Sequence, residues 1–230
     1  MQTIKLIDKL DKLPVFGVDD VCRITGKDRK YAKLKLSRMH KKRLVKRIIR
    51  DKYTRKRNPF VIASHLYNPS YISFWSASQF YGYTDQLPIA IKVVTDKARG
   101  SINFDNIRFD FIKSKNIFGF RTIRIAEGRI CIADHEKLLI DAVSRPDLMG
   151  NEGEILNVYE SVSPNTKKLI KYLKHQMVMS VTKRVGSLIE LTQRIDISKA
   201  FTLDSNYTKG ITGLPLSDNL SKKWRIKGDQ

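Results

Sequence analysis

Apolar residues in the first 26 positions recur at helical spacing and predict two short helices. Ile4, Ile7 and Leu10 fall three residues apart, the spacing of a helix that buries one side. A second helix is predicted over Val18–Thr25, and Gly26 ends it because glycine breaks the apolar pattern. A helix followed by such a tight turn and a third helix is typical of the helix-turn-helix.

The third helix is predicted to begin after Asp28, a good N-cap residue, and to run to about residue 42. On a helical wheel Ala32, Leu36 and Met39 lie within about 40° of one another and form a core stripe. A cationic outward side suits a recognition helix in the major groove, although a solvated charged face would look the same. The predicted DNA contacts here are Lys27, Arg29, Lys30, Lys33, Ser37 and Lys41.

Residues 44–53 alternate loosely between apolar and charged positions and turn at 50–52, which predicts a β-hairpin. A hairpin directly after a recognition helix is a wing, whose cations would follow the phosphate backbone or enter a minor groove. The wing residues predicted to contact DNA are Arg47, Arg50, Lys52, Arg55 and Lys56, with Arg57 beside them.

Residues 58–166 mix helical and alternating patterns. Asn68-Pro69 predicts a helix start, with the helix running through Trp75 to Phe80. Strands are predicted over 89–95, 102–104, 107–112, 120–126 and 129–132. Asp105-Asn106 and Glu127-Gly128 lie where hairpin turns would go, so the sheet should be mostly antiparallel.

The last hundred residues predict further helices. Asp134 would cap a helix to about Ser144, Ser163-Pro164 would open another, and residues 181–191 a third. A closing extended segment is expected to bury Trp224. The predicted fold class is α+β: a winged helix-turn-helix over 1–57, then an α+β domain over 58–230 with a mostly antiparallel sheet and C-terminal helices.

The formal net charge of +21 is distributed unevenly. Residues 1–57 carry 20 Lys/Arg against 6 Asp/Glu, residues 58–166 are nearly neutral, and residues 167–230 carry 13 against 5. An excess concentrated on a predicted helix and wing favours double-stranded DNA as partner over a generally basic surface. If about five phosphates are engaged, log K should fall with log salt at a slope of roughly −4 to −5.

Several other classes of protein are disfavoured. There is no apolar run long enough for a membrane span and no signal-peptide core, so we expect a cytoplasmic protein without a membrane partner. Cys22 and Cys131 lack neighbouring Cys or His at metal-ligand spacing, so we expect no metal, no disulfide and no cofactor.

Two further sets of charged residues allow more than one role. Asp134, Glu136 and Asp141 would suit a metal-dependent enzyme acting on nucleic acid, but acids in a first helical turn also complement the helix dipole. Because no phosphate loop or nucleophile elbow accompanies them, we expect no catalytic residues and no enzyme. In the basic tail, Lys183, Arg184 and Arg194 would contact a protein partner or extend the DNA footprint.

The order of motifs resembles the AbiEi family, the antitoxins of type IV abortive-infection toxin-antitoxin systems. The resemblance covers the chain from about residue 14 to the end. It is carried by YISFWSA at 71–77, YG at 81–82, FG at 118–119, IADHEKLLID at 132–141 and KRVGSLIE at 183–190. The sequence departs from the family pattern at His135, where proline is frequent, and at Val185, where leucine is frequent.

This resemblance implies a repressor of its own toxin-antitoxin operon that binds inverted repeats through its N-terminal region. It also implies that the C-terminal region counteracts a nucleotidyltransferase-like toxin, and that the antitoxin is not itself an enzyme. A solitary winged-helix transcription factor with a ligand-sensing middle domain is the alternative. The residues do not distinguish sequestration of the toxin from its modification or from indirect antagonism.

Overall fold

The computed structural model describes residues 2–86, 90–214 and 216–227. The chain forms two compact units, each built from several segments. The first comprises Met1–Ile72, Ile89–Lys115 and Thr122–Ile132, and the second Ser73–Pro88, Asn116–Arg121 and Ala133–Gln230. Within the described ranges, no helix combines the length and the apolar character that crossing a bilayer requires.

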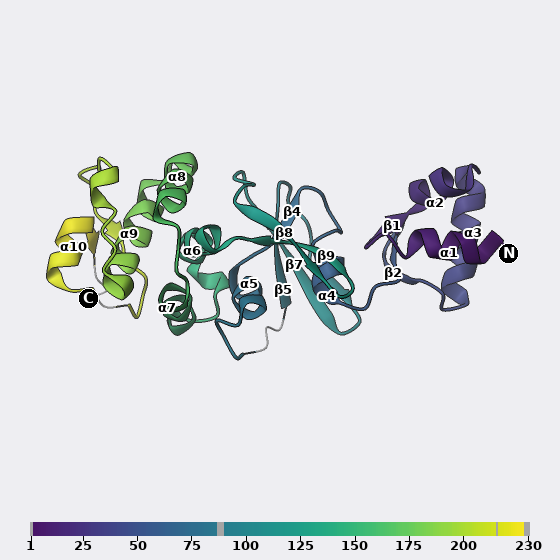
Figure 1. Cartoon of the computed structure of the whole chain (residues 1–230), viewed down its shortest axis with the longest axis horizontal. Coiled ribbons are helices and arrows are strands. Elements are labelled where there is room, and N and C mark those ends of the chain that lie inside the picture. Colours follow the sequence, from purple (N-terminus) through teal and green to yellow (C-terminus); the bar gives the residue numbers. More distant parts are fainter. Residues whose placement is uncertain (1, 87–89, 215, 228–230) are drawn as a thin grey trace. The chain divides into compact units, whose positions relative to one another are not determined.

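The first unit begins with a winged helix-turn-helix (Figure 1). Its helices and strands are α1 Gln2–Leu10, β1 Phe16–Gly17, α2 Val18–Thr25, α3 Arg29–Lys41, β2 Lys46–Ile49 and β3 Lys52–Thr54. The strands form an antiparallel sheet in the order β1-β3-β2, in which Phe16 pairs with Tyr53. The predicted helix-turn-helix and wing are therefore present, and α2 has the predicted bounds.

Local signals explain where α2 and α3 begin and end. The side chain of Asp20 accepts a hydrogen bond from the Gly17 N–H at 2.9 Å at the start of α2, and Gly26 ends that helix with φ 69°. Asp28 caps α3 by accepting from the Tyr31 N–H at 2.7 Å. The prediction for α1 was wrong in one respect, because Ile4 is 66% exposed and the buried residues of α1 are Leu6 and Leu10.

A six-stranded mixed sheet forms the rest of the first unit. Its strands follow the order β6-β7-β5-β4-β9-β8, and α4 Pro59–Ala63 contacts β5. The strands are β4 Ser70–Ile72, β5 Ala90–Thr95, β6 Ile102–Phe104, β7 Ile107–Lys113, β8 Phe120–Ile125 and β9 Gly128–Ala133. Together with the wing the sheets are mostly antiparallel, as predicted, but β5 pairs with β7 and β4 with β9 in parallel.

The helix predicted from Asn68-Pro69 is present but begins later than predicted. The Asn68-Pro69 peptide is cis, and Ser70–Ile72 is strand β4, which pairs with β5 and β9. The helix α5 begins only at Phe74 and runs to Tyr81. All three residues of β4 are buried, so the strand lacks the polar alternation that would have distinguished it from a buried helix.

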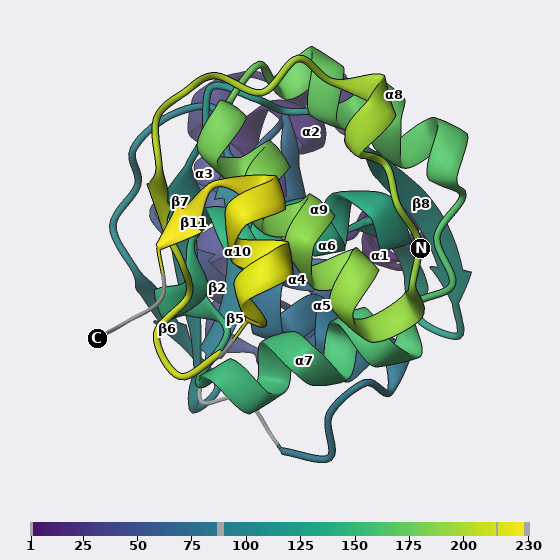
Figure 2. The same cartoon turned by 90° about the vertical axis from the view of Figure 1, so that its left-hand side faces the viewer.

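The second unit is mainly helical, and α9 lies at its centre (Figure 2). Helices α6, α7 and α10 all contact α9. After α5, the elements are α6 His135–Ser144, the 3-10 turn Pro146–Leu148, α7 Glu152–Ser161, α8 Thr166–Gln176, α9 Met179–Gln193, the 3-10 turn Ser198–Ala200, β10 Thr208–Lys209, α10 Asp218–Trp224 and β11 Ile226–Lys227. Strands β10 and β11 pair in parallel.

Two predictions for the second unit need correction, and one of its helices was not predicted. The cap of α8 is Asn165, which accepts from the Lys168 N–H at 3.0 Å, and not Ser163. Trp224 is buried as predicted, but it ends helix α10 instead of lying in an extended segment. Helix α7, capped by Asn151, was not predicted, although asparagine followed three residues later by Glu154 is a recognisable start signal.

Candidate nucleic-acid interface

Helix α3 separates its apolar residues from its cations. Ala32, Leu36 and Met39 are buried in the core that α1, α2 and the wing share. Because they occupy one face, the opposite face is left to solvent. All six residues that the sequence assigned to DNA on or beside this helix are exposed: Lys27, Arg29, Lys30, Lys33, Ser37 and Lys41. The structure thus brings the predicted contacts of α3 onto one accessible surface.

One of these cations already has an acidic partner. The Arg29 guanidinium forms an ion pair with Asp19 in the first turn of α2, and both side chains remain exposed. Exposed ion pairs are weak, about 0–1 kcal/mol, so this contact orients Arg29 without preventing an exchange for phosphate. The charge that Arg29 offers to a polyanion is nevertheless partly compensated by Asp19.

The wing turn packs closely on the start of α2. Gly17 pairs with Lys52 of β3, and a Cβ on Gly17 would lie 2.6 Å from the backbone oxygen of Asp51. Only glycine allows this approach, which fixes the turn against the helix-turn-helix. Arg47 and Arg50 are exposed on the hairpin, whereas Lys52 is half-buried. Of these three predicted contacts, Arg47 and Arg50 are therefore exposed.

The other two predicted wing contacts differ from expectation. Arg55 donates from Nε to Asp11 Oδ1 at 2.5 Å and from Nη1 to the Leu44 backbone oxygen at 2.8 Å. Its side chain is only 25% exposed, so its guanidinium joins α1 to the base of the wing. Two of its five N–H donors are therefore used inside the protein, which argues against its assignment to DNA. Lys56 is half-buried beside it.

The residues just before α4 are hydrogen-bonded to Glu127, which belongs to the same unit. The backbone N–H groups of Arg57 and Asn58 both donate to Glu127 Oε2 at 2.8 Å. These two hydrogen bonds, from Asn58 and from Arg57, lower the pKa of the Glu127 carboxyl from its ordinary value. The segment after the wing is thus tied to the β8–β9 turn.

The basic residues predicted in the tail have internal roles. Lys183 is buried, and its ammonium donates to Asp204 Oδ1 at 2.5 Å and to the backbone oxygen of Asn206. Arg184 donates to the backbone oxygens of Lys209 at 3.0 Å and Val143 at 3.2 Å. Lys183 is therefore not accessible to a partner or to DNA, contrary to the prediction. Arg184 is half-buried, and its contact with a partner or with DNA stays a prediction.

The third tail residue has a different environment. Arg194 follows α9 with φ 58°, as the C-cap, and its side chain is exposed. The structure therefore leaves Arg194 accessible, and its contact with a partner or with DNA stays a prediction.

The rest of the 183–190 motif joins α10 to α9. A Cβ on Gly186 would lie 2.1 Å from the Trp224 ring, so the indole fills the space that glycine leaves. Trp224 Nε1 donates to Glu190 Oε2 at 2.8 Å, and the Lys223 ammonium donates to Glu190 Oε1 at 2.6 Å. The 183–190 motif thus joins two helices of the second unit.

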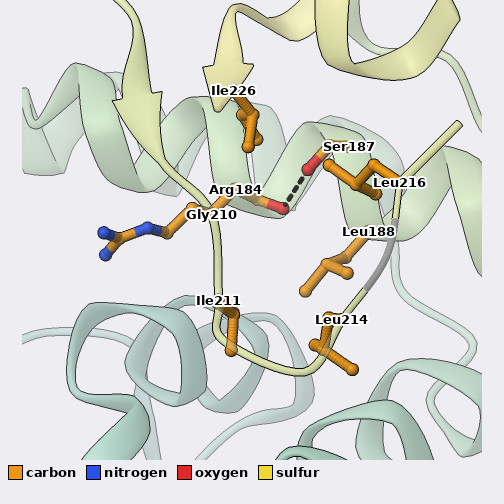
Figure 3. A pocket seen from close by; sticks show the side chains of 8 residues that line it. All are labelled: Arg184, Ser187, Leu188, Gly210, Ile211, Leu214, Leu216 and Ile226. Atoms are coloured by element: carbon orange, nitrogen blue, oxygen red, sulfur yellow. Dashed lines mark hydrogen bonds between the residues drawn. The ribbon is translucent and has the colours of Figure 1, made fainter. Parts of the chain in front are cut away.

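A small pocket beside this motif offers no room for a ligand. It has a volume of about 10 Å³, and its lining is mainly apolar (Figure 3). The Ser187 hydroxyl is directed at the Arg184 carbonyl, to which it donates at 3.0 Å, while the Arg184 guanidinium points away from the leucines. Drug-sized ligands need cavities of roughly 300–1,000 Å³. This pocket is therefore too small for such a ligand.

The three carboxylates considered for catalysis are engaged in hydrogen bonds. Asp134 accepts from the Tyr172 hydroxyl at 2.8 Å and the Lys168 ammonium at 3.0 Å. Asp141 accepts from Lys137 Nζ at 2.5 Å and Ser73 Oγ at 2.7 Å. Among the described residues, no group of three His, Cys, Asp or Glu side chains could hold a metal ion.

The third carboxylate, Glu136 of α6, binds two residues at the start of α8. It accepts from Lys168 at 2.7 Å and from the Asn165 N–H at 2.8 Å. Burial alone would raise the pKa of Glu136, but the hydrogen bonds from Lys168 and Asn165 outweigh it and lower that pKa. Burial and the bond to Asp134 raise the pKa of Tyr172 to about 12. The arrangement is a charge-paired connection of α6 to α8.

Comparisons with known proteins bear on the fold. No protein-family model matches the sequence, and no curated protein matches it. The crystal structure of the RV2827C protein from Mycobacterium tuberculosis is similar, with a TM-score of 0.60 over 98% of this chain and 90% of that chain. The two sequences are 13% identical, so the likeness shows a shared α+β fold and nothing about activity.

Proposed function

We propose that the protein is a DNA-binding antitoxin and transcriptional autorepressor of a type IV toxin-antitoxin operon. The observation that carries the DNA-binding part is the exposed cationic side of α3 beside the exposed arginines of the wing. Recognition helices present hydrogen-bonding side chains in this way to base edges, while wing cations contact phosphates. The partner is double-stranded DNA with inverted repeats in its own promoter.

The antitoxin part rests on the resemblance of the 132–141 and 183–190 motifs to the AbiEi pattern. Apart from Ile132, both motifs lie in the second unit, where they hold helices together. The second unit would counteract a nucleotidyltransferase-like toxin in the cytoplasm, and no cofactor or catalytic residue of this chain is required. A solitary regulator remains the alternative, in which the first unit binds DNA and no toxin exists.

Two experiments test the DNA-binding part and the antitoxin part of this proposal separately. Fluorescence anisotropy on the gene's own promoter and on a scrambled duplex of equal length measures specificity, and equal affinities would reject the repressor. Co-expression with an adjacent nucleotidyltransferase-like gene, with the antitoxin under an independent promoter, measures neutralisation. Growth should be restored by the wild type and by the Lys33→Ala, Ser37→Ala double variant, because neutralisation does not require base contacts. Failure of both to restore growth favours the solitary regulator.

A further inference from the structure

A basic groove lies between α1 and α3, and of the residues that the sequence assigned to DNA only Lys27 lines it. Its volume is about 270 Å³. The lining residues are Lys5, Leu6 and Lys9 of α1, Ile24 and Thr25 of α2, Lys27, and Tyr31 and Lys35 of α3. Four are lysines, and none of the described residues that line the groove carries a carboxylate. We call this set the α1–α3 groove.

The wing lies on one flank of α3. His40 Nδ1 is 3.2 Å from the Val45 backbone oxygen, and the His40 ring meets the edge of Tyr53 in β3. Tyr31 precedes His40 by nine residues, which is two and a half turns at 3.6 residues per turn, so the two residues lie on opposite sides of α3. The α1–α3 groove, which includes Tyr31, is therefore on the opposite flank from the wing. The exposed Ser37 and Lys41 lie on the helix side between these flanks.

This placement matches the geometry of a helix in duplex DNA. The major groove of B-DNA is about 12 Å wide, and a helix with its side chains is about 10–12 Å across. A helix seated there therefore has one phosphate strand along each flank. Lysine ammonium groups bind phosphates as point charges, and tyrosine hydroxyls donate to phosphate oxygens.

We propose that the α1–α3 groove binds the sugar-phosphate backbone of the strand opposite the one that the wing follows. Lys5 and Lys9 supply the charge, because both are exposed and both line the groove. The Tyr31 hydroxyl, on a side chain that is 39% exposed, supplies a hydrogen bond. This inference rests on the proposed DNA binding and adds a second backbone contact that the wing does not provide.

The test is a double variant in α1, Lys5→Gln with Lys9→Gln, in the full-length protein. Lys12→Gln is the matched control, because Lys12 is exposed and follows α1 but does not line the groove. Dissociation constants are measured over a series of salt concentrations on promoter DNA and on scrambled DNA. The loss of two phosphate contacts should reduce the slope of log K against log salt by about 1.8 on both duplexes. The control should leave that slope unchanged.

Ethylation interference gives an independent readout. Wild-type protein should be blocked by ethylated phosphates in two clusters, one on each strand, and the double variant should lose one cluster only. An unchanged slope and both clusters retained would overturn the inference. If the double variant binds DNA as the wild type does but no longer binds the toxin, the groove binds an acidic protein surface instead.

The two proposals can fail separately. If the wild type shows no preference for promoter DNA but the slope still falls in the double variant, specific repression is rejected and the backbone contact stands. If the wild type prefers its promoter and the slope does not change, only the groove inference is rejected. If no duplex is bound at all, both are rejected. Circular dichroism of each variant checks that the exposed substitutions leave the fold intact.

Discussion

Gly186 of α9 and Trp224 of α10 are in direct contact, because the indole occupies the place where a Cβ would be. Trp224 is fully buried and also donates to Glu190 one turn further along α9. A helix–helix contact of this kind depends on one glycine and one large ring that are 38 residues apart in the sequence. This contact explains why position 186 needs a glycine although it lies within a helix.

Gly186→Ala should therefore destabilise the second unit. The added methyl would lie 2.1 Å from a ring carbon, so the indole must move. Overpacking of this kind costs about 1–3 kcal/mol of unfolding free energy. Urea unfolding followed by tryptophan fluorescence measures the loss. Gly100→Ala is the control, because nothing lies within 4 Å of its Cβ position. An equal effect of the two substitutions would contradict the contact.

Lys183→Ala should act on stability and not on partner binding. The buried ammonium donates to Asp204 and to the Asn206 carbonyl, and its removal leaves these groups without that donor. We expect a loss of about 1–3 kcal/mol in the free energy of unfolding. Arg194→Ala, at an exposed site after α9, should change it by less than about 0.5 kcal/mol. Chemical denaturation compares them, and a neutral Lys183→Ala would argue for a surface role.

The substitutions Arg55→Ala and Arg50→Ala should differ in their effects on stability and on DNA binding. Arg55 bonds to Asp11 and the Leu44 carbonyl, so Arg55→Ala should lower stability by about 1 kcal/mol with an unchanged salt slope of DNA binding. Arg50 is exposed on the wing, so Arg50→Ala should reduce that slope by about 0.9 for one phosphate with stability unchanged. Thermal melts and salt-dependent anisotropy separate the two. The reverse pattern would show that Arg55 is the DNA contact.

The Glu136 carboxylate predicts a pH dependence of stability. Its folded pKa is lower than its ordinary value of 4.5, because the bonds from Lys168 and Asn165 outweigh its burial. Its contribution is then fully present above pH 4.5 and is lost as the pH falls through the folded pKa. Glu136→Gln should destabilise the protein above pH 4.5, and the difference from wild type should shrink at lower pH.

The control for this titration is Glu160→Gln, at an exposed position of α7. It should change the free energy of unfolding by less than about 0.5 kcal/mol. Urea unfolding of all three proteins over a pH series provides the measurement. A difference between wild type and Glu136→Gln that stays constant with pH would contradict the assigned hydrogen bonds.

Helix α3 could be predicted from the sequence because its signals are local. Asp28 caps it, Gly26 precedes it, and the buried stripe that includes Leu36 repeats within the helix itself. β4 could not be predicted in the same way. Its buried residues look alike in a helix or a strand, and its partners β5 and β9 lie far away in the sequence.

The internal role of Lys183 also depends on distant residues. Its partners Asp204 and Asn206 are 21 and 23 residues away, so a lysine within a basic tail gave no sign of burial. The α1–α3 groove needs the packing of three helices, which helical spacing does not specify. Lys5 and Lys9 were at least recognisable as an i, i+4 pair, next to the residues Leu6 and Leu10 that α1 buries.

The central claim is that α3 reads DNA sequence, and the specificity ratio of the Lys33→Ala, Ser37→Ala double variant tests it most directly. The ratio compares dissociation constants on promoter and scrambled duplex at one salt concentration, with Lys222→Ala on α10 as a control for removing an exposed lysine. We predict that the double variant loses about 1–3 kcal/mol of promoter preference. The control should keep the wild-type ratio. A wild-type ratio near one, or a ratio unchanged in the double variant, would contradict the claim.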